Sequence, residues 1–211
     1  MAFFREFAQD LRLLHRLRLG EGPVTVPGGL RLLLTSRGLL VLAAHRLRHR
    51  CYELRLDGSR GPRWLALRLQ LLLGDPLTMI LAKADIQAFC QVEPGVVLSD
   101  LGHLVIGARR IGAGSIIHDH VTIGLDVTRT GWETPNIGRS VWIGPNCVIH
   151  GNIDIGDGST IMPNTVLSKN VPERTVVMGN PARFVMRDFD NTALLSSLRV
   201  VGSVSDLTAC P

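Results

Sequence analysis

Aromatic residues are scarce in this 211-residue sequence, and long apolar runs are missing. Phe, Trp and Tyr make up 5% of the residues and hydrophobic residues 45%, so the core must be built largely from aliphatic side chains. No stretch of 18 apolar residues occurs, which excludes a membrane-spanning helix. The first residues, MAFFREFAQDLRLL, carry charges within their apolar part and lack the core of a signal peptide. We therefore expect a globular, cytoplasmic protein.

Cysteine is rare and scattered. The four residues, Cys51, Cys90, Cys147 and Cys210, form no CxxC pair and no close pair of any kind. This usage is typical of a reducing compartment, and it excludes the ligand spacing of a structural zinc site. We predict no bound metal.

Negative charge is scarce in the first part of the chain. Residues 1–83 contain 14 Lys and Arg against 6 Asp and Glu, whereas the remainder contains 9 against 12. The arginines have no interleaved aromatic residues, so the pattern does not favour nucleic acid as a partner. Two interpretations stay open: basic helices that face solvent or a partner protein, and basic helices that make peripheral contact with an anionic membrane.

A period of six residues organises the chain from Ile111 to Val176. It fits neither a helix nor a single alternating strand, but it is typical of a solenoid of short strands. We expect the repeated aliphatic residue, and the residue two places before the next aliphatic, to point inward. Glycine follows many of these aliphatics, where we expect it to adopt unusual backbone angles. The repeated aliphatic residues are Ile111, Ile117, Ile123, Ile137, Ile143, Ile149, Ile155, Ile161 and Leu167.

The rest of the chain divides around this repeat. Amphipathic patterns predict helices over residues 3–19, about 30–55 and 63–73. We predict a helical region over 1–84, a solenoid domain over 85–186 and a tail over 187–211. A polar insertion, LDVTRTGWETPN (125–136), interrupts the repeat, and loops of this length are commonly functional.

Histidines supply the candidate catalytic groups. His118 and His120 flank Asp119 directly after an inward aliphatic, so both should point outward, and His103 ends the preceding turn. Coils of a solenoid stack about 4.8 Å apart, so these residues should form one polar patch with Ser99 and Asp100. We predict His103, His118, His120 and Asp100 as catalytic, with a histidine as the proton acceptor. His150 lies further along. Metal ligation and simple surface exposure are the alternatives for this cluster.

The segments LVIGARRIGAGSIIHDHVTIG and NIGRSVWIGPNCVIHGNIDIGDGSTIMPNTVLSKNVPERTVVMGNPARFV resemble the hexapeptide-repeat acyltransferases. The resemblance is to their serine acetyltransferase-like branch, which includes O-acetyltransferases of polysaccharide biosynthesis. It implies a mainly β fold, a left-handed parallel β-helix with an N-terminal α-helical region. It also implies acyl transfer from acetyl-CoA, as co-substrate, to a hydroxyl group. Family members are usually homotrimers with CoA between adjacent β-helices. The implied CoA-binding residues are Gly124, Gly144, Pro163 and Asn164 along one edge, and Lys169 and Arg183 for phosphates.

The chain departs from the serine acetyltransferase pattern at two places. The Asp-His pair of that family falls here on Ser99 and Asp100, and a second family histidine falls on Thr134, next to Glu133. We therefore predict a different hydroxyl acceptor, a sugar or glycan precursor. The alternatives are serine O-acetyltransferase activity and a non-catalytic β-helix scaffold.

Overall fold

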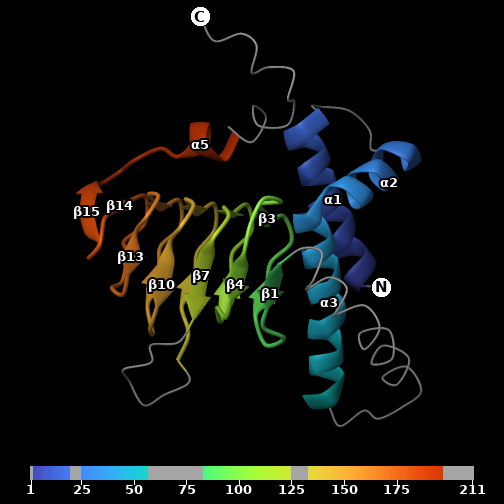
Figure 1. Cartoon of the computed structure of the whole chain (residues 1–211), viewed down its shortest axis with the longest axis horizontal. Coiled ribbons are helices and arrows are strands. Elements are labelled where there is room, and N and C mark those ends of the chain that lie inside the picture. Colours follow the sequence, from blue (N-terminus) through green and yellow to red (C-terminus); the bar gives the residue numbers. More distant parts are fainter. Residues whose placement is uncertain (1, 20–24, 57–82, 125–132, 197–211) are drawn as a thin grey trace, which may run out of the picture.

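A computed structural model describes residues 2–19, 25–56, 83–124 and 133–196 of the chain. Helices precede a parallel β-solenoid of five coils, as Figure 1 shows, which confirms the predicted fold class. The helix predicted over 63–73, Cys210 and most of the polar insertion lie outside the described residues.

Three helices form the N-terminal region: α1 (Ala2–Leu19), α2 (Val26–Thr35) and α3 (Arg37–Leu56). The prediction of one helix over 30–55 was wrong, because extended backbone at Ser36 separates α2 from α3. Ser36 is itself a cap, since its Oγ accepts a hydrogen bond from the Leu39 N–H at 3.2 Å. Helix α2 also begins earlier than predicted. Thr25 caps it by accepting the Gly28 N–H, and a proline is tolerated in the first turn, where backbone N–H groups have no helical partner.

The first four coils each contribute one strand to each of three parallel sheets, which we call A, B and C, and the fifth coil contributes strands to sheets A and C. Sheet A contains β1 (Ala84–Ile86), β4 (Leu104–Ile106), β7 (Val121–Gly124), β10 (Val148–His150) and β13 (Val166–Leu167). Sheet B contains β2 (Gln91–Val92), β5 (Arg110–Ile111), β8 (Asn136–Ile137) and β11 (Asp154–Ile155). Sheet C contains β3 (Val97–Leu98), β6 (Ile116–Ile117), β9 (Trp142–Ile143), β12 (Thr160–Ile161), β14 (Val176–Met178) and the antiparallel β15 (Arg183–Met186). A short helix, α5 (Thr192–Ser196), follows.

The solenoid interior is filled by the residues that the period of six predicts. All nine repeated aliphatics are at most 2% exposed, and the small inward residues Ser115, Cys147 and Thr165 are fully buried. The outer faces of the three sheets differ. Leucines of α1 and α5 cover sheet C around Trp142, whereas sheet A leaves Val105 and Val148 exposed. Sheet A therefore has an open apolar outer face, and the strands β14 and β15 at the end of sheet C expose apolar side chains as well.

The glycines of the repeat are required for a different reason from the one predicted. None of Gly112, Gly138, Gly144 and Gly156 has a positive φ. A Cβ atom on any of them would instead lie 2.4–2.8 Å from an atom of the next coil, which is closer than atoms can approach. Gly124 is the exception, because a Cβ atom there would meet nothing within 4 Å.

Basic side chains of α3 complete the open end of the solenoid. The first coil has no preceding coil, so the backbone carbonyls on its outer edge have no strand partner. His45 and His49 hydrogen-bond the carbonyls of Cys90 and Ala88 at 3.0 and 2.8 Å. Arg46 and Arg48 donate to further carbonyls of the coil, those of Val92, Glu93 and Ile86. The basic character of this helix therefore serves the fold in part, where the sequence predicted only solvent, partner or membrane contacts.

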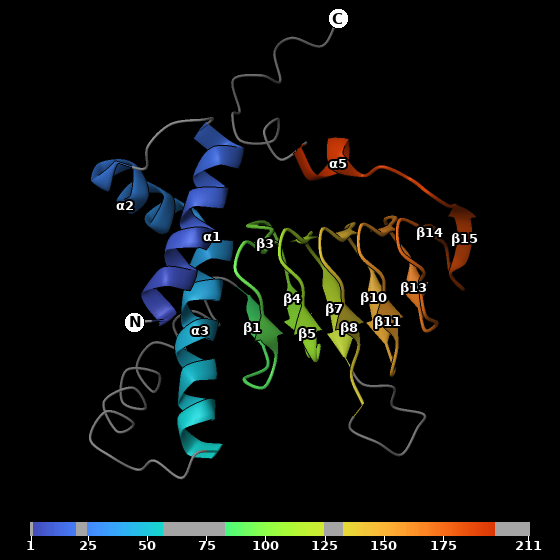
Figure 2. The same ribbon diagram turned by 180° about the vertical axis from the view of Figure 1, so that it is seen from behind.

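A buried ion pair joins α1 and α3 to the first coil, at the end of the solenoid where Figure 2 shows the two helices side by side. The Arg46 Nε donates to Asp10 Oδ2 at 2.7 Å, and the two side chains are 4% and 1% exposed. Asp10 Oδ1 also accepts the Gly95 N–H at 2.7 Å. Because one carboxylate serves both a helix and a coil, the position of the helices depends on it.

Replacing Arg46 by Met should therefore destabilise the protein strongly. The change leaves the Asp10 carboxylate buried without its cation, and breaking a buried pair in this way costs about 3–5 kcal/mol. Urea unfolding measures the loss. Arg50→Met is the matched control, since the Arg50 side chain is 55% exposed and should contribute less than about 1 kcal/mol. Equal stability of the two variants would contradict the assigned role.

His45 should make the stability depend on pH. Burial, helped by the nearby His49, lowers its pKa to about 4 from 6.5. The unfolded chain takes up a proton below pH 6.5, whereas the folded chain does so only near pH 4. Stability is thus complete above pH 6.5 and falls as the pH drops from 6.5 to 4, by up to about 3 kcal/mol from this residue. Unfolding in urea at four pH values should show a shallower fall for His45→Gln, whereas the exposed control His120→Gln should match the wild type. Identical slopes for wild type and His45→Gln would contradict the prediction.

Candidate active site

Most of the predicted site residues lie on one long edge of the solenoid, formed by the turns that lead from sheet C to sheet A. We call this the C–A edge (residues 99–103, 118–120, 144–147 and 162–165). Successive turns are joined by backbone hydrogen bonds, from Asn146 N to Asp119 O at 3.1 Å and from Asn164 N to Pro145 O at 3.0 Å. The predicted catalytic histidines and three predicted CoA-binding residues, Gly144, Pro163 and Asn164, therefore share one edge.

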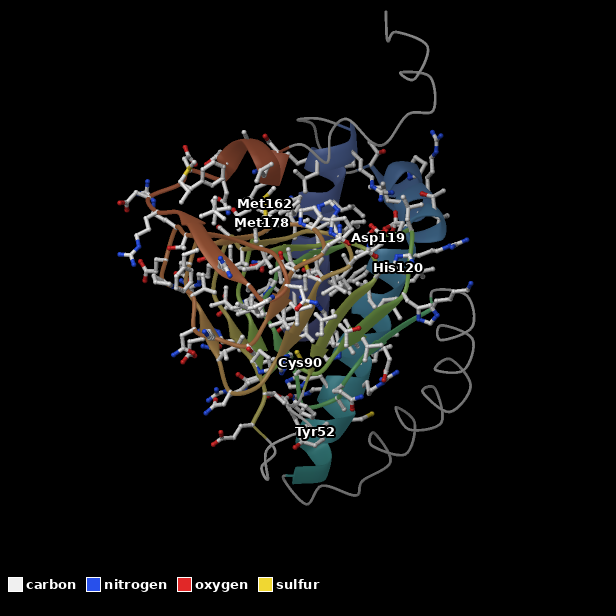
Figure 3. The ribbon with its side chains drawn as sticks, turned by 60° about the vertical axis from the view of Figure 1, so that its left-hand side comes forward. Tyr52, Cys90, Asp119, His120, Met162 and Met178 are labelled. Atoms are coloured by element: carbon white, nitrogen blue, oxygen red, sulfur yellow. The ribbon has the colours of Figure 1, made fainter. Side chains whose placement is uncertain are left out.

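His120 and His103 are the accessible histidines of the C–A edge. The His120 side chain is 53% exposed, and its Nδ1 lies 3.2 Å from Asp119 Oδ2 (Figure 3). Its φ of +56° places it at a tight corner. The turn that contains Gly102 and His103 stacks directly on His120. A Cβ atom on Gly102 would lie 2.8 Å from His120 Nδ1. An exposed imidazole on this edge can accept a proton from a bound hydroxyl group.

His118 is outward, as predicted, but it is not open to solvent. Its ring packs against Trp142 of sheet C, with centroids 4.8 Å apart. Its Nε2 is buried and has no hydrogen-bond partner among the described residues. Burial lowers the pKa of His118, and the nearby Asp119 opposes this shift. The surroundings of His118 therefore differ from those of His103 and His120, whose side chains are exposed.

Asp100 is occupied by contacts with the helices. Its Oδ1 accepts the Gly38 N–H at 2.7 Å and the Ser36 hydroxyl at 2.9 Å, and its Oδ2 pairs with Arg18. Gly38 lies in the first turn of α3, where a carboxylate is favoured by the unpaired N–H groups and by the helix dipole. Its catalytic assignment stays a prediction, and the structure gives the carboxylate a structural task.

A cavity of about 780 Å³ lies at the opposite edge of sheet A, between the end of α3 and the first coils. Exposed apolar side chains and polar groups both line it, and the Arg109 Nη2 of this lining donates a hydrogen bond to Asn152 Oδ1 at 3.1 Å. The insertion ends here, because Glu133 and Thr134 are lining residues. The lining residues are Tyr52, Gln87, Phe89, Val105, Gly107, Arg109, Ile123, Gly124, Glu133, Thr134 and Asn152.

The six predicted CoA-binding residues do not share one edge. Gly124 ends β7 of sheet A and lines the cavity, whereas Gly144 follows β9 of sheet C. The prediction that these two glycines lie along one edge was wrong, because the width of sheet A separates the two turns. Lys169 is exposed after β13, and Arg183 is exposed at the start of β15. Both cations are accessible to an anionic group.

The cavity is the part of the molecule that the sequence pattern does not predict. Tyr52, Phe89 and Arg109 come from a helix and two turns that the period of six does not relate to each other. His150 received no role from the sequence, although strand alternation after the buried Ile149 predicts that it faces outward. Among the described residues no three His, Cys, Asp or Glu side chains are grouped as a metal site. In the same part of the chain no helix is long and apolar enough to cross a bilayer.

Comparison with known proteins identifies relatives over most of the chain. Residues 134–169 match the family described as bacterial transferase hexapeptide (six repeats). Serine acetyltransferase 4 of Arabidopsis thaliana is 31% identical over 155 residues, which cover 72% of this chain and 40% of that protein. The chain therefore spans less than half the length of this plant relative.

Solved structures show the same architecture. The serine acetyltransferase of Neisseria gonorrhoeae, solved in complex with serine, is 26% identical with a TM-score of 0.67 and matches 88% of this chain and 69% of its own. The serine acetyltransferase of Brucella abortus, solved in complex with Coenzyme A, shares the fold with a TM-score of 0.66 at 24% identity, over 87% of this chain and 69% of that one.

Replacing Asp100 by Ala should destabilise the protein by about 1–3 kcal/mol, because the Gly38 N–H and the Ser36 hydroxyl lose their partner. Thermal or urea unfolding measures the change. Leu101→Ala is the control in the same turn, since Leu101 is 73% exposed and should be close to neutral. An unfolding curve of Asp100→Ala that superimposes on the wild type would contradict the structural task assigned to this carboxylate.

Proposed function

Because the chain belongs to the hexapeptide-repeat transferases of the serine acetyltransferase family, we propose that it is an acetyl-CoA-dependent O-acetyltransferase. The observation that carries the proposal is the C–A edge. Exposed histidines and the residues implied to line CoA follow one another there on stacked turns. A donor bound along this edge would bring its thioester to an imidazole.

The chemistry follows from these groups. His120 or His103 accepts the proton of the acceptor hydroxyl, and the oxygen attacks the carbonyl carbon of the thioester. Backbone N–H groups of the turns stabilise the negative charge on the carbonyl oxygen. The C–S bond then breaks, and the CoA sulfur leaves with the proton from the imidazole. Lys169 and Arg183 are the cations proposed to meet the phosphates of CoA.

Serine is the acceptor that the relatives support. The matching plant protein and the aligned solved structures are named serine acetyltransferases, and one of them was solved with serine bound. These findings favour serine over the sugar acceptor that the sequence departures suggested. We therefore rank serine O-acetylation first.

A sugar hydroxyl is the second candidate, and the cavity at the edge of sheet A favours it. A volume of about 780 Å³ is large for serine. Tyr52 and Phe89 offer exposed aromatic faces to a sugar ring, and Arg109, Asn152 and Glu133 offer hydrogen bonds to several hydroxyls. The engaged Asp100 also stands where the resemblance expects a histidine.

We also propose that the chain forms a homotrimer. The exposed Val105 and Val148 on the outer face of sheet A support this proposal, since helices cover sheet C around Trp142 and the outer face of sheet B is polar. If sheet A of one copy packed against a second copy, the cavity at the edge of sheet A would lie close to that second copy.

Thiol release from acetyl-CoA tests the function. We expect turnover with L-serine, or with sugars such as D-glucose and methyl glucoside, in a panel assayed side by side. His120→Ala and His103→Ala should separate the roles, because loss of the proton acceptor lowers kcat by about 10²–10⁴. Arg12→Ala, on the exposed face of α1, is the control and should leave the rate unchanged.

The pattern across the panel distinguishes the alternatives. Turnover with serine alone would exclude the sugar acceptor, and turnover with sugars alone would exclude serine. No thiol release with any acceptor would contradict the proposed function and favour a non-catalytic scaffold.

A further inference from the structure

The exposed side of α1 carries a row of arginines outside the candidate site. Among the described side chains of this helix, four are exposed, and they are Arg5, Gln9, Arg12 and Arg16. Their spacing is i, i+4, i+7 and i+11, which places them on one face of a helix. We call these four residues the basic stripe. It is about 16 Å long, because a helix rises about 1.5 Å per residue.

The acidic residues of α1 do not neutralise the basic stripe. Glu6 and Asp10 are the two acids of the helix, and both pair with Arg46 of α3. The Asp10 side chain is 1% exposed, so its charge is held on the inner side of α1. No ion pair joins an arginine of the stripe to an acid within the described ranges of the chain. The fold thus uses the negative charge of this helix internally and leaves its outer side positive.

Helix α2 packs beside α1 and carries no acidic residue. The two helices adjoin where a Cβ atom on Gly28 would lie 4.0 Å from His15 Nε2. On α2, Arg31 is exposed and Leu30 is 55% exposed, and Arg37 is exposed at the start of α3. Figure 1 shows α1 and α2 at the end of the molecule opposite β15. Positive charge therefore gathers at the helical end, whereas residues 84–211 contain 9 Lys and Arg against 12 Asp and Glu.

Anionic phospholipid headgroups are the partner chemistry that the basic stripe fits. Protein interfaces depend on aromatic or aliphatic anchors that fill pockets, and the stripe itself contains none. The exposed described side chains of α1 and α2 include no aromatic ring on which a nucleic-acid base could stack. A lipid surface needs neither feature, because its negative potential attracts clustered arginines. The exposed Leu30 also suits a bilayer, where apolar side chains enter between the headgroups.

We propose that the basic stripe docks the protein onto an anionic membrane surface. The contact is peripheral, because Leu11, Leu14 and Leu17 on the apolar side of α1 pack against sheet C and cannot enter the bilayer. It is also electrostatic, so dissolved salt screens it. The residues of the stripe lie neither on the C–A edge nor in the lining of the cavity. The docking therefore goes beyond the proposed function and does not depend on it.

Sedimentation with lipid vesicles tests the proposal on the full chain. We expect the wild type to bind vesicles of phosphatidylcholine that contain about 30% phosphatidylserine at low salt. It should not bind vesicles of phosphatidylcholine alone. Binding to the anionic vesicles should be lost when the NaCl concentration is raised to about 0.5 M, because the Debye length then falls to a few ångströms.

Arg12→Gln/Arg16→Gln should bind the anionic vesicles at least about tenfold more weakly, since two arginines near the surface are removed. Gln is a good helix former, so α1 should be retained. Arg174→Gln/Arg187→Gln is the matched control. It removes the same charge from exposed positions near β14 and β15 and should bind like the wild type. Thermal unfolding and light scattering check that both variants keep the fold and the oligomeric state of the wild type.

Each contrary outcome overturns the proposal. Equal binding of the wild type and Arg12→Gln/Arg16→Gln, or an equal loss in the control, shows that the stripe is not the contact. A wild type that ignores anionic vesicles excludes the membrane. Tighter binding to a DNA duplex of about 30 base pairs assigns the stripe to nucleic acid, and a lower molecular mass of Arg12→Gln/Arg16→Gln assigns it to contact between copies. Thiol release tests the proposed function separately from all of these results.

Discussion

A parallel solenoid leaves its first coil with backbone carbonyls that no strand can satisfy, and the rest of this structure depends on how that need is met. The donors come from α3, whose arginines and histidines reach Ile86, Ala88 and Cys90. Helix α3 is in turn fixed to α1 through the buried Asp10–Arg46 pair. Its first turn is held by Asp100 of the C–A edge. The cap of the solenoid and one end of the candidate site therefore depend on the same helix, α3.

The period of six divides the solenoid into positions for packing and positions for chemistry. The repeated inward aliphatics are fully buried, so a substrate cannot contact them. The coils differ from one another at the edges and on the outer faces of the sheets. His120 stands at one edge and His150 near the other, with the width of a short sheet between them.

The sequence predicted what local spacing controls. Inward aliphatics, outward histidines and the solenoid itself follow from residue types at fixed intervals. Contacts between distant segments could not be predicted in this way. The basic residues of α3 look solvated in the sequence, since nothing local shows that carbonyls of the first coil face them. Asp100 was assigned to catalysis for the same reason, because its partners Ser36 and Gly38 are more than sixty residues away. The cavity combines Tyr52 with residues of four coils, and the period of six does not relate Tyr52 to them. The glycines were located correctly but explained wrongly, because close stacking is a property of two coils and not of one.

The two ends of the solenoid are closed by unlike means, a helix with charged donors at the first coil and the reversed strand β15 at the last. Between them, the last two coils repeat at an interval of 18 residues, since Val148 pairs with Val166. Such a molecule can gain or lose length only in whole coils from its middle, because either terminus would lose its closure. Tandem duplication of one 18-residue unit would lengthen the C–A edge while both closures, and the helices that form one of them, stayed intact.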